Sequence, residues 1–316
     1  MNYYIGIDLG GTNIKVGVVT ESGNIIAEHS TKTLATRSYQ EIVADMAMCI
    51  EKCLQKSCIS KDHVVSIGIG IPGVADQKTG RVIFCTNLGW RDIPLAEELQ
   101  KYLDKPVYID NDATVAGLAE SVAGVSKNAS CSVFLTLGTG VGGGIILNNR
   151  PWSGVHGVGT EIGHMTLVVD GVPCTCGNEG CVERYCSATA LIRMAKLECL
   201  GYPDSEIVTL AKGEIENINA KHVIDAAKNG DAVAVRLFER YCKYLAIAIN
   251  NITAFLDPEM IVIGGGVSTA GTFLLDNIVA FLPRFLMYKN LPSPSVVLAQ
   301  LGNEAGIIGA AMLGKV

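Results

Sequence analysis

Residues 164–181 read HMTLVVDGVPCTCGNEGC and bring one histidine and three cysteines close together in the chain. His164, Cys174, Cys176 and Cys181 offer one imidazole and three thiolates, a ligand set that suits tetrahedral zinc in a structural site. The alternative is a group of reduced thiols that bind no metal. Because protein would fill all four coordination positions, we expect this zinc to hold loops together rather than to catalyse a reaction.

Two glycine-rich segments, LGGTNIKVGVV (9–19) and LGTGVGGGIIL (137–147), are alike. Each places glycines and a threonine between two strand patterns, where backbone N–H groups can approach an anion without interference from a Cβ. The pair predicts a phosphate chain held from both sides, although either turn alone would also serve simply to join two strands. The residues expected at the phosphates are Gly10, Gly11, Thr12, Gly138, Thr139 and Gly140.

Charged residues flank the first hairpin and a later helix. Asp8 precedes the first glycines and would hold Mg²⁺ or one of its waters, and Lys15 follows them and would meet phosphate charge. In YIDNDATVAGLAE (108–120), Asn111 and Asp112 come between a strand pattern and a helix pattern. Its position alone favours an N-cap role for Asp112.

Two common nucleotide motifs do not fit this chain. The pattern G-x-G-x-x-G occurs at 68–73 and 138–143, but a dinucleotide site needs it to open a helix whose N-terminus meets the pyrophosphate. Pro72 interrupts the first match, and a strand pattern follows the second. The P-loop pattern G-x-x-x-x-G-K-S/T does not occur in the sequence. We therefore expect neither a Rossmann site nor a P-loop.

The composition limits the classes of partner. The chain has 316 residues, 49% of them hydrophobic, which is enough for two lobes with their own cores. A formal net charge of −6 argues against nucleic acid and membrane surfaces as partners, because both need a basic footprint. The sequence shows neither a signal-peptide pattern nor a run of 18 apolar residues. Eleven cysteines, an odd number, favour reduced thiols, so we expect a cytosolic protein.

Strand and helix patterns alternate along the chain and predict an α/β architecture. The clearest strand patterns are 3–9, 14–20, 64–71, 106–110, 131–138, 142–148, 260–266 and 296–300, and the clearest helix patterns are 41–58, 230–256 and 271–288. The expected lobes are residues 1–124, with the first hairpin, and residues 125–302, with the second. A closing helix over 303–316 is expected to return to the first lobe.

Four segments carry a family resemblance: DLGGTNIK (8–15), LGTGVGGG (137–144), EIGH (161–164) and CTCGNEGCVE (174–183). In this order they resemble the signature segments of the ROK family, which contains sugar kinases and related repressors of the actin/hexokinase-like superfamily. The resemblance runs from residue 5 to the closing LGNEAGIIGAA (301–311). It implies two ribonuclease H-like lobes with ATP and a sugar in a catalytic cleft between them. It also implies zinc at the His-Cys₃ set.

The resemblance assigns roles that position alone leaves open. Its catalytic aspartate matches Asp112, which would accept the proton of the attacking sugar hydroxyl as general base. The family usually has asparagine where this chain has Thr114. His164 would ligate zinc through one ring nitrogen and face the sugar with the other. The residues implied at the sugar are Gly73, Asn87, Asn111, Asp112, Glu161, His164 and Glu183.

Two of the implied groups have a simpler explanation. Asn87 lies in TNLGW (86–90), and an Asn-Leu-Gly turn needs no function to exist. Gly264, Gly265 and Gly266 follow a strand pattern and would open an adenosine pocket, but a strand-to-helix turn would look the same. Both alternatives stay open at this point.

The expectation that results is a hexose kinase that uses ATP with Mg²⁺. Repressors of the family place a helix-turn-helix module ahead of the first hairpin, and here the first strand pattern starts at Tyr3. A catalytically inactive sugar-binding protein is opposed by the retention of Asp8 and Asp112. The pocket residues include no lysine or arginine and so suit a neutral sugar. The resemblance of TNLGW, LGTGVGGGI and the closing segment to family members that act on glucose implies glucose, phosphorylated at its 6-hydroxyl. N-acetylmannosamine or another hexose or N-acetylhexosamine is the alternative. We also expect a homodimer or a higher homo-oligomer.

Overall fold

The computed structural model describes residues 2–316, which divide into two compact units. Unit 1 holds the chain up to Phe134, Gly144–Thr160 and Ala299–Val316, and unit 2 holds Leu135–Gly143 and Glu161–Leu298. Residues 125–134, 144–160 and 299–302, which we expected in the second lobe, group with unit 1. Close packing explains the second of these segments, because a Cβ on Gly144 would lie 2.8 Å from the Thr114 Cα.

The main sheet of unit 1 has the strand order β3-β2-β1-β4-β8. The first three strands pair antiparallel, while β1 with β4 and β4 with β8 pair parallel. The parallel half therefore brings the carboxyl ends of three strands to one edge. The strands are β1 (Tyr3–Leu9), β2 (Asn13–Thr20), β3 (Ile25–Lys32), β4 (Val64–Ile71) and β8 (Val107–Asn111).

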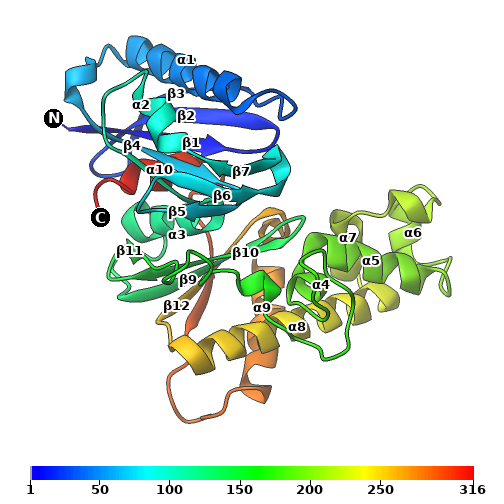
Figure 1. The fold of residues 1–316 in the computed structure, drawn as a ribbon. Coiled ribbons are helices and arrows are strands. Elements are labelled where there is room, and N and C mark those ends of the chain that lie inside the picture. Colours follow the sequence, from blue (N-terminus) through cyan, green and yellow to red (C-terminus); the bar gives the residue numbers. More distant parts are fainter. Residues whose placement is uncertain (1) are drawn as a thin grey trace. The chain divides into compact units, whose positions relative to one another are not determined.

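Helices cover both faces of this sheet (Figure 1). Helix α1 (Tyr39–Ser57) begins with a capping box in which Ser38 and Glu41 satisfy each other's backbone N–H groups. It packs on β2 and β3 and buries Ile42, Met46 and Cys49 in the unit 1 core, at the spacing of one helical face. On the other face, α10 (Ala305–Met312) packs on the sheet and on α3 (Asp112–Ala123).

Two strand glycines allow α10 to lie directly on the sheet. A Cβ on Gly6 would lie 1.9 Å from the Ile307 carbonyl oxygen, and a Cβ on Gly68 would lie 1.7 Å from the Ala310 carbonyl oxygen. Both obstacles are helix backbone, which cannot rotate out of the way as a side chain would. The contact between β4 and α10 thus depends on the absence of a side chain at position 68.

We expect Gly68→Ala to lower the free energy of unfolding by at least about 2 kcal/mol, because the helix must move off the strand. Urea unfolding followed by circular dichroism measures this change. Gly201→Ala is the matched control, since its Cβ would meet only the Glu198 carbonyl oxygen at an ordinary 3.7 Å. Its effect should stay within about 0.5 kcal/mol. Equal stabilities of the two variants would contradict the packing argument.

A small sheet and a short helix complete the middle of unit 1. The sheet consists of β5 (Val74–Asp76), β6 (Arg81–Cys85) and β7 (Trp90–Ile93), in that order and paired antiparallel. Helix α2 (Leu95–Gln100) follows and contributes Leu95 and Leu99 to the unit 1 core. The sequence patterns did not predict these elements.

The second five-stranded sheet has the order β11-β10-β9-β12-β13, and the boundary between the units falls within β9 and β10. Strands β12 and β13 pair parallel in unit 2. Their bounds are β9 (Cys131–Leu137), β10 (Val141–Leu147), β11 (Arg150–Pro151), β12 (Met260–Gly264) and β13 (Ser295–Leu298).

The rest of unit 2 is mostly helical. Its helices are α4 (Glu183–Cys186), α5 (Ala188–Cys199), α6 (Glu206–Leu210), α7 (Ala220–Lys228), α8 (Ala232–Leu256) and α9 (Thr272–Phe281). Helix α8 is capped by Asp231 and buries one face, which includes Phe238, Tyr241 and Leu245. Short 3₁₀ helices occur in unit 2 at Ile162–His164, Ile215–Asn217, Gly266–Ala270 and Leu282–Arg284, and in unit 1 at Lys61–His63, Thr86–Leu88 and Gly302–Glu304.

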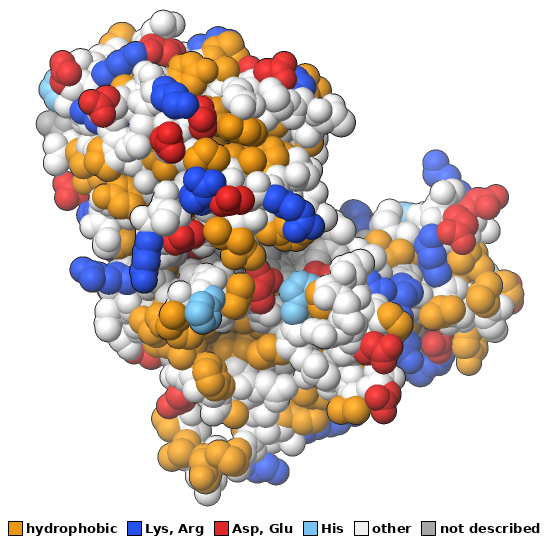
Figure 2. Space-filling model, viewed as in Figure 1, with side chains coloured by type: hydrophobic (Ala, Val, Ile, Leu, Met, Phe, Trp, Pro, Cys, Tyr) orange, Lys and Arg blue, Asp and Glu red, His pale blue; other side chains and the backbone are white. Residues whose placement is uncertain are grey.

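Surface charges are mixed. On the face drawn in Figure 2, Lys and Arg side chains are interspersed with Asp and Glu side chains in both units. Within residues 2–316, none of the helices is both long enough and apolar enough to cross a membrane.

Candidate active site

Polar residues gather at the carboxyl edge of the parallel strands in unit 1. Asp8 lies near the end of β1 opposite Gly70 of β4, and Ile71 at the end of β4 lies opposite Asn111 at the end of β8. Ligands of open α/β sheets bind outside the carboxyl ends of the strands. Of the unit 1 residues that we expected at ATP and sugar, Gly10–Thr12, Gly73, Asn111 and Asp112 follow or end these strands.

Asp8 and Lys15 face each other across the first hairpin. They are paired residues of β1 and β2, and the Lys15 Nζ lies 3.5 Å from the Asp8 Oδ2. Burial raises the pKa of Asp8, and the lysine opposes this shift. Gly306, in the first turn of α10, packs against the carboxylate, since a Cβ there would lie 2.7 Å from the Asp8 Cγ. The helix thus confines Asp8 on one side and leaves Lys15 as its cationic partner.

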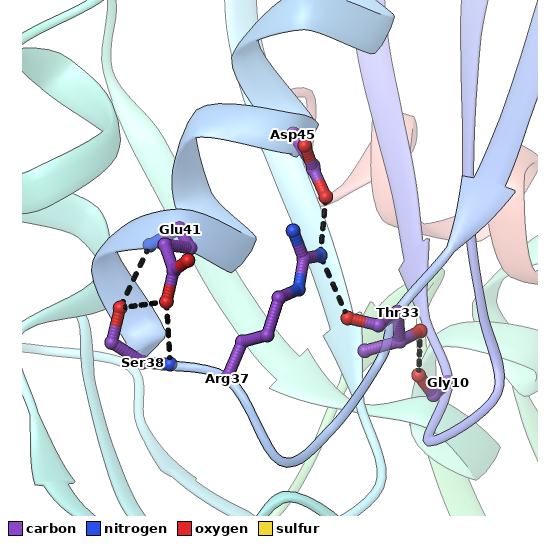
Figure 3. A network of polar contacts seen from close by, with 6 residues as sticks. All are labelled: Gly10, Thr33, Arg37, Ser38, Glu41 and Asp45. Atoms are coloured by element: carbon purple, nitrogen blue, oxygen red, sulfur yellow. Dashed lines mark hydrogen bonds and ion pairs between the residues drawn. The ribbon is translucent and has the colours of Figure 1, made fainter.

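The first glycine hairpin is braced from the end of β3 (Figure 3). The buried Thr33 donates its hydroxyl to the Gly10 carbonyl oxygen at 2.6 Å, and its N–H donates to the Thr12 carbonyl oxygen at 3.0 Å. The Thr33 carbonyl in turn accepts from Arg37 at 3.0 Å, and Arg37 pairs with Asp45 of α1. The hairpin conformation is therefore tied to the helix that covers the sheet.

Asn111, not Asp112, is the N-cap of α3. Its Oδ1 accepts from the N–H groups of Ala113 and Thr114 at 2.9 and 3.3 Å, and its Nδ2 donates to the Gly73 carbonyl oxygen at 3.1 Å. Asp112 is the exposed first residue of the helix, and its Oδ1 accepts from the Ala113 N–H at 2.8 Å. The capping role that position alone favoured for Asp112 is therefore wrong, because its neighbour performs it.

Asn87 lies beside the tip of the first hairpin. It belongs to the turn Thr86–Leu88, and a Cβ on Gly11 would lie 3.3 Å from the Asn87 Cβ. Burial raises the pKa of the nearby Cys85 thiol, hydrogen bonds to the Leu88 and Asn87 backbone oppose this shift, and the Asp112 charge adds to it. The structure thus brings Asn87 to the first hairpin.

Thr114, the departure from the family pattern, is fully buried in α3. Its hydroxyl lies 3.4 Å from that of Thr160, which is also buried. Thr160 directly precedes Glu161 in the chain. This hydroxyl pair joins α3 to the end of the 144–160 segment.

In unit 2, the second hairpin meets the glycines that follow β12. The Gly138 N–H donates to the Gly140 carbonyl oxygen at 3.0 Å and closes the turn. Gly265 has a φ of 84°, and a Cβ there would lie 2.6 Å from the Leu137 carbonyl oxygen. A side chain at 265 would therefore be excluded by both conformation and space. Gly265 thus lies directly against Leu137, where the hairpin begins.

The His-Cys₃ set is assembled. The possible ligand atoms of His164, Cys174, Cys176 and Cys181 all lie within 4.8 Å of one another. Zinc bonds of about 2.3 Å to sulfur place the sulfurs of a tetrahedral site about 3.8 Å apart. The Cys176 and Cys181 Sγ atoms lie 3.6 Å apart, and the Cys174 Sγ lies 3.7 Å from the His164 Nδ1. These distances fit zinc.

The cysteines of the cluster differ in protonation. Burial, together with the neighbouring Cys176 and Cys174 thiols, raises the pKa of Cys181 to about 12. A cation would be required to hold the Cys181 sulfur as a thiolate at neutral pH. The other ring nitrogen of His164, Nε2, lies 3.9 Å from the Glu161 Oε2. His164 is thus placed with Nδ1 towards the sulfurs and Nε2 towards Glu161.

Three positioning contacts carried no signal in the sequence. Thr33 lies 23 residues from Gly10, which it braces. Thr189 donates its hydroxyl to the Thr139 carbonyl oxygen at 2.8 Å across 50 residues. The buried carboxylate of Asp110 accepts from the Asn111 N–H at 2.7 Å and has a pKa raised to about 6 by burial. Each was hidden because its partner is distant in sequence or is backbone.

The chain is similar to known proteins over nearly its whole length. The family model described as "ROK family" matches residues 4–316. The chain is 37% identical to a glucokinase of Halalkalibacterium halodurans over 99% of this chain and 95% of that protein. It is 36% identical to a glucokinase of Thermotoga maritima over 98% of this chain and 96% of that protein. A crystal structure of a ROK family glucokinase from Streptomyces griseus, in complex with glucose and AMPPNP, is 35% identical with a TM-score of 0.83 and covers 99% of both chains.

The mixed sheets, each with a glycine hairpin between neighbouring strands, define an actin/hexokinase-like fold, and solved ROK structures share it over nearly their whole length. The chain belongs to the ROK family.

Proposed function

We propose that this protein is an ATP-dependent sugar kinase that transfers the γ-phosphoryl group of ATP to the 6-hydroxyl of glucose. The proposal rests on the polar set at the carboxyl edge of the parallel strands in unit 1, which includes Asp112. The chain also aligns over 99% of its length with a glucokinase solved with glucose and AMPPNP. The full-length identity to two further glucokinases supports the same substrate pair.

Asp112 acts as the general base. Its carboxylate accepts the proton of the attacking hydroxyl, a role typically worth about 10²–10⁴-fold in rate. Asn111 holds the start of α3, and its amide links the helix to the Gly73 carbonyl. Gly73, Asn87 and Asn111 then orient the sugar with backbone and amide groups. Orientation of this kind converts an encounter between two molecules into a reaction within one complex.

The ATP phosphates are held by both hairpins. Backbone N–H groups of residues 10–12 and 138–140 approach the phosphates, and Lys15 contributes positive charge. Asp8 offers a carboxylate oxygen, the kind of ligand that Mg²⁺ prefers. Gly306 and Lys15 lie against this carboxylate and limit the space around it. This suits a Mg²⁺ ion that binds only one or two protein oxygens and keeps several of its waters. Bound with ATP, Mg²⁺ supplies charge neutralisation at the phosphates. Gly264, Gly265 and Gly266 form the adenosine side of the nucleotide site.

The His-Cys₃ set holds a structural zinc. The zinc fixes the His164 tautomer through Nδ1, so that Nε2 is presented to the sugar beside Glu161. Glu161, His164 and Glu183 accept from and donate to sugar hydroxyls. All eleven cysteines are unpaired by disulfides, which fits the cytosolic location proposed from the sequence. We also propose a homodimer or larger homo-oligomer, on the basis of the family resemblance alone.

We expect kcat/KM for glucose to exceed that for N-acetylmannosamine by at least about tenfold, which is roughly 1.4 kcal/mol of transition-state preference. A site built to bond particular hydroxyls leaves its own polar groups unpaired when an analogue lacks them. A coupled assay of ADP formation, with both sugars at the same ATP and Mg²⁺ concentrations, measures the ratio.

The control is the rate with ATP and Mg²⁺ but no sugar, which reports hydrolysis alone. A preference for N-acetylmannosamine of about tenfold or more would overturn the glucose assignment, and the kinase chemistry would remain.

A further inference from the structure

The segment that follows the last cysteine of the His-Cys₃ set is hydrogen-bonded to the second glycine hairpin in unit 2. The turn of this hairpin is Gly138–Gly140, and the segment that binds the hairpin runs from Glu183 to Thr189. Three hydrogen bonds join them, and each ends on a backbone group of the hairpin.

The Glu183 carboxylate forms the first contact. Its Oε2 accepts from the Val141 N–H at 3.0 Å, and a Cβ on Gly140 would lie 2.2 Å from the same oxygen. Only a glycine at 140 leaves room for this approach. The Glu183 Oε2 therefore holds the hairpin backbone at Val141. A sugar bound to the same carboxylate would be linked to the hairpin through Glu183.

The start of α5 forms the other two contacts. The Ala188 N–H donates to the Gly138 carbonyl oxygen at 2.8 Å, and the Thr189 Oγ1 donates to the Thr139 carbonyl oxygen at 2.8 Å. With both carbonyls turned towards α5, the peptide planes of the turn are fixed. In unit 1, Thr33 binds the Gly10 carbonyl oxygen in the same way.

A second flank of the His-Cys₃ set packs on the same hairpin. A Cβ on Gly163, which directly precedes His164, would lie 2.0 Å from the Val141 carbonyl oxygen. The segments on both sides of the cluster therefore touch Val141, one through Gly163 and one through Glu183.

We propose that Glu183 and Thr189 are positioning residues for the nucleotide: they hold the 138–141 hairpin in the shape that receives the ATP phosphates. Glu183 thereby couples the sugar-binding set to the phosphate-binding hairpin. This inference rests on the proposed function, because it takes the hairpin as a phosphate site and Glu183 as a sugar contact.

The decisive variant is Thr189→Val, which removes the hydroxyl donor and keeps the side-chain shape. The dissociation constant of MgADP, measured by calorimetry without any sugar, should rise by about fivefold, the size of one net hydrogen bond. Thr189→Ser keeps the donor and should restore the wild-type value. The glucose dissociation constant, measured without nucleotide, should stay within about twofold of wild type, since Thr189 is linked to the hairpin and not to the sugar set.

Thr253→Val is the matched control. Thr253 donates its hydroxyl to the Ile249 carbonyl oxygen at 2.8 Å within α8, so the same chemical change is made away from the hairpin contacts. Its MgADP affinity should equal that of wild type. Thermal melting of each variant shows that it is folded; Thr189 is exposed, so Thr189→Val should melt near wild type. An unchanged MgADP affinity in Thr189→Val, or a loss that Thr189→Ser does not restore, would overturn the proposal.

Glu183→Ala tests the coupling. It should weaken MgADP without sugar and glucose without nucleotide, each by about fivefold or more. Loss of glucose affinity with unchanged MgADP affinity would show a sugar contact only and would overturn the coupling. If the wild-type protein does not bind glucose, the proposed function is overturned. The MgADP measurements need no sugar, so they still decide the role of the hairpin contacts in that case.

Discussion

Asp112→Asn is expected to lower kcat for glucose phosphorylation by roughly 10²–10⁴-fold. The amide keeps the size of the carboxylate but cannot accept the proton of the attacking hydroxyl. Glucose affinity should be largely retained, because Gly73, Asn87 and Asn111 remain in place. The loss should therefore appear in kcat and in kcat/KM together, as it does when an interaction made only in the transition state is removed. Steady-state rates and glucose titration by calorimetry measure the two quantities.

The structure makes this variant a clean test. Asn111 supplies the cap of α3, so the substitution at 112 leaves the capping hydrogen bonds intact. It removes a favourable charge in the first turn, worth about 0.3–1 kcal/mol. Asp204→Asn, at an exposed position outside the set, controls for the loss of one negative charge. Near-normal turnover in Asp112→Asn with a lowered melting temperature would assign Asp112 a structural role instead.

Cys176→Ser is expected to abolish tight zinc binding. Purified wild-type protein should contain about one zinc per chain, and the variant should lose more than about 100-fold in zinc affinity, since even the outer partners of a zinc ligand are worth roughly 10–100-fold. Glucose affinity should fall as well, because His164 loses the metal that fixes its ring. Elemental analysis after dialysis and glucose calorimetry provide the two measurements.

Cys58→Ser is the control for this substitution, because Cys58 is also exposed but lies outside the cluster. It should retain the zinc and the glucose affinity of wild type. Active wild-type enzyme without zinc would contradict the structural-zinc proposal, whatever the behaviour of the variants.

Local patterns in the sequence predicted much of the fold. The period of the apolar residues in 41–58 predicted α1, and the structure adds the Ser38–Glu41 capping box at its start. The glycine hairpins after β1 and β9 were visible because their special residues are neighbours in the chain. The spacing of His164, Cys174, Cys176 and Cys181 indicated a metal cluster for the same reason, and the structure places their possible ligand atoms within 4.8 Å of one another.

Features that depend on distant partners were not predictable in this way. Strands β5, β6 and β7 are short, and their pairing with one another stabilises them more than any periodicity of their own. The grouping of residues 144–160 with unit 1 follows from the packing of β10 on α3, which no local pattern encodes. The choice between Asn111 and Asp112 as the cap required the side-chain geometry, because both residue types are good caps.

The position of the phosphoryl group on the product tests the central proposal most directly. Glucose labelled with carbon-13 at C6 is incubated with ATP, Mg²⁺ and the wild-type protein, and the C6 resonance is followed by NMR. We predict that this resonance shifts and acquires a coupling to phosphorus, with one ADP formed for each glucose converted. A C6 resonance that stays unchanged while the protein is folded and binds MgADP would contradict the assignment as a glucose 6-kinase.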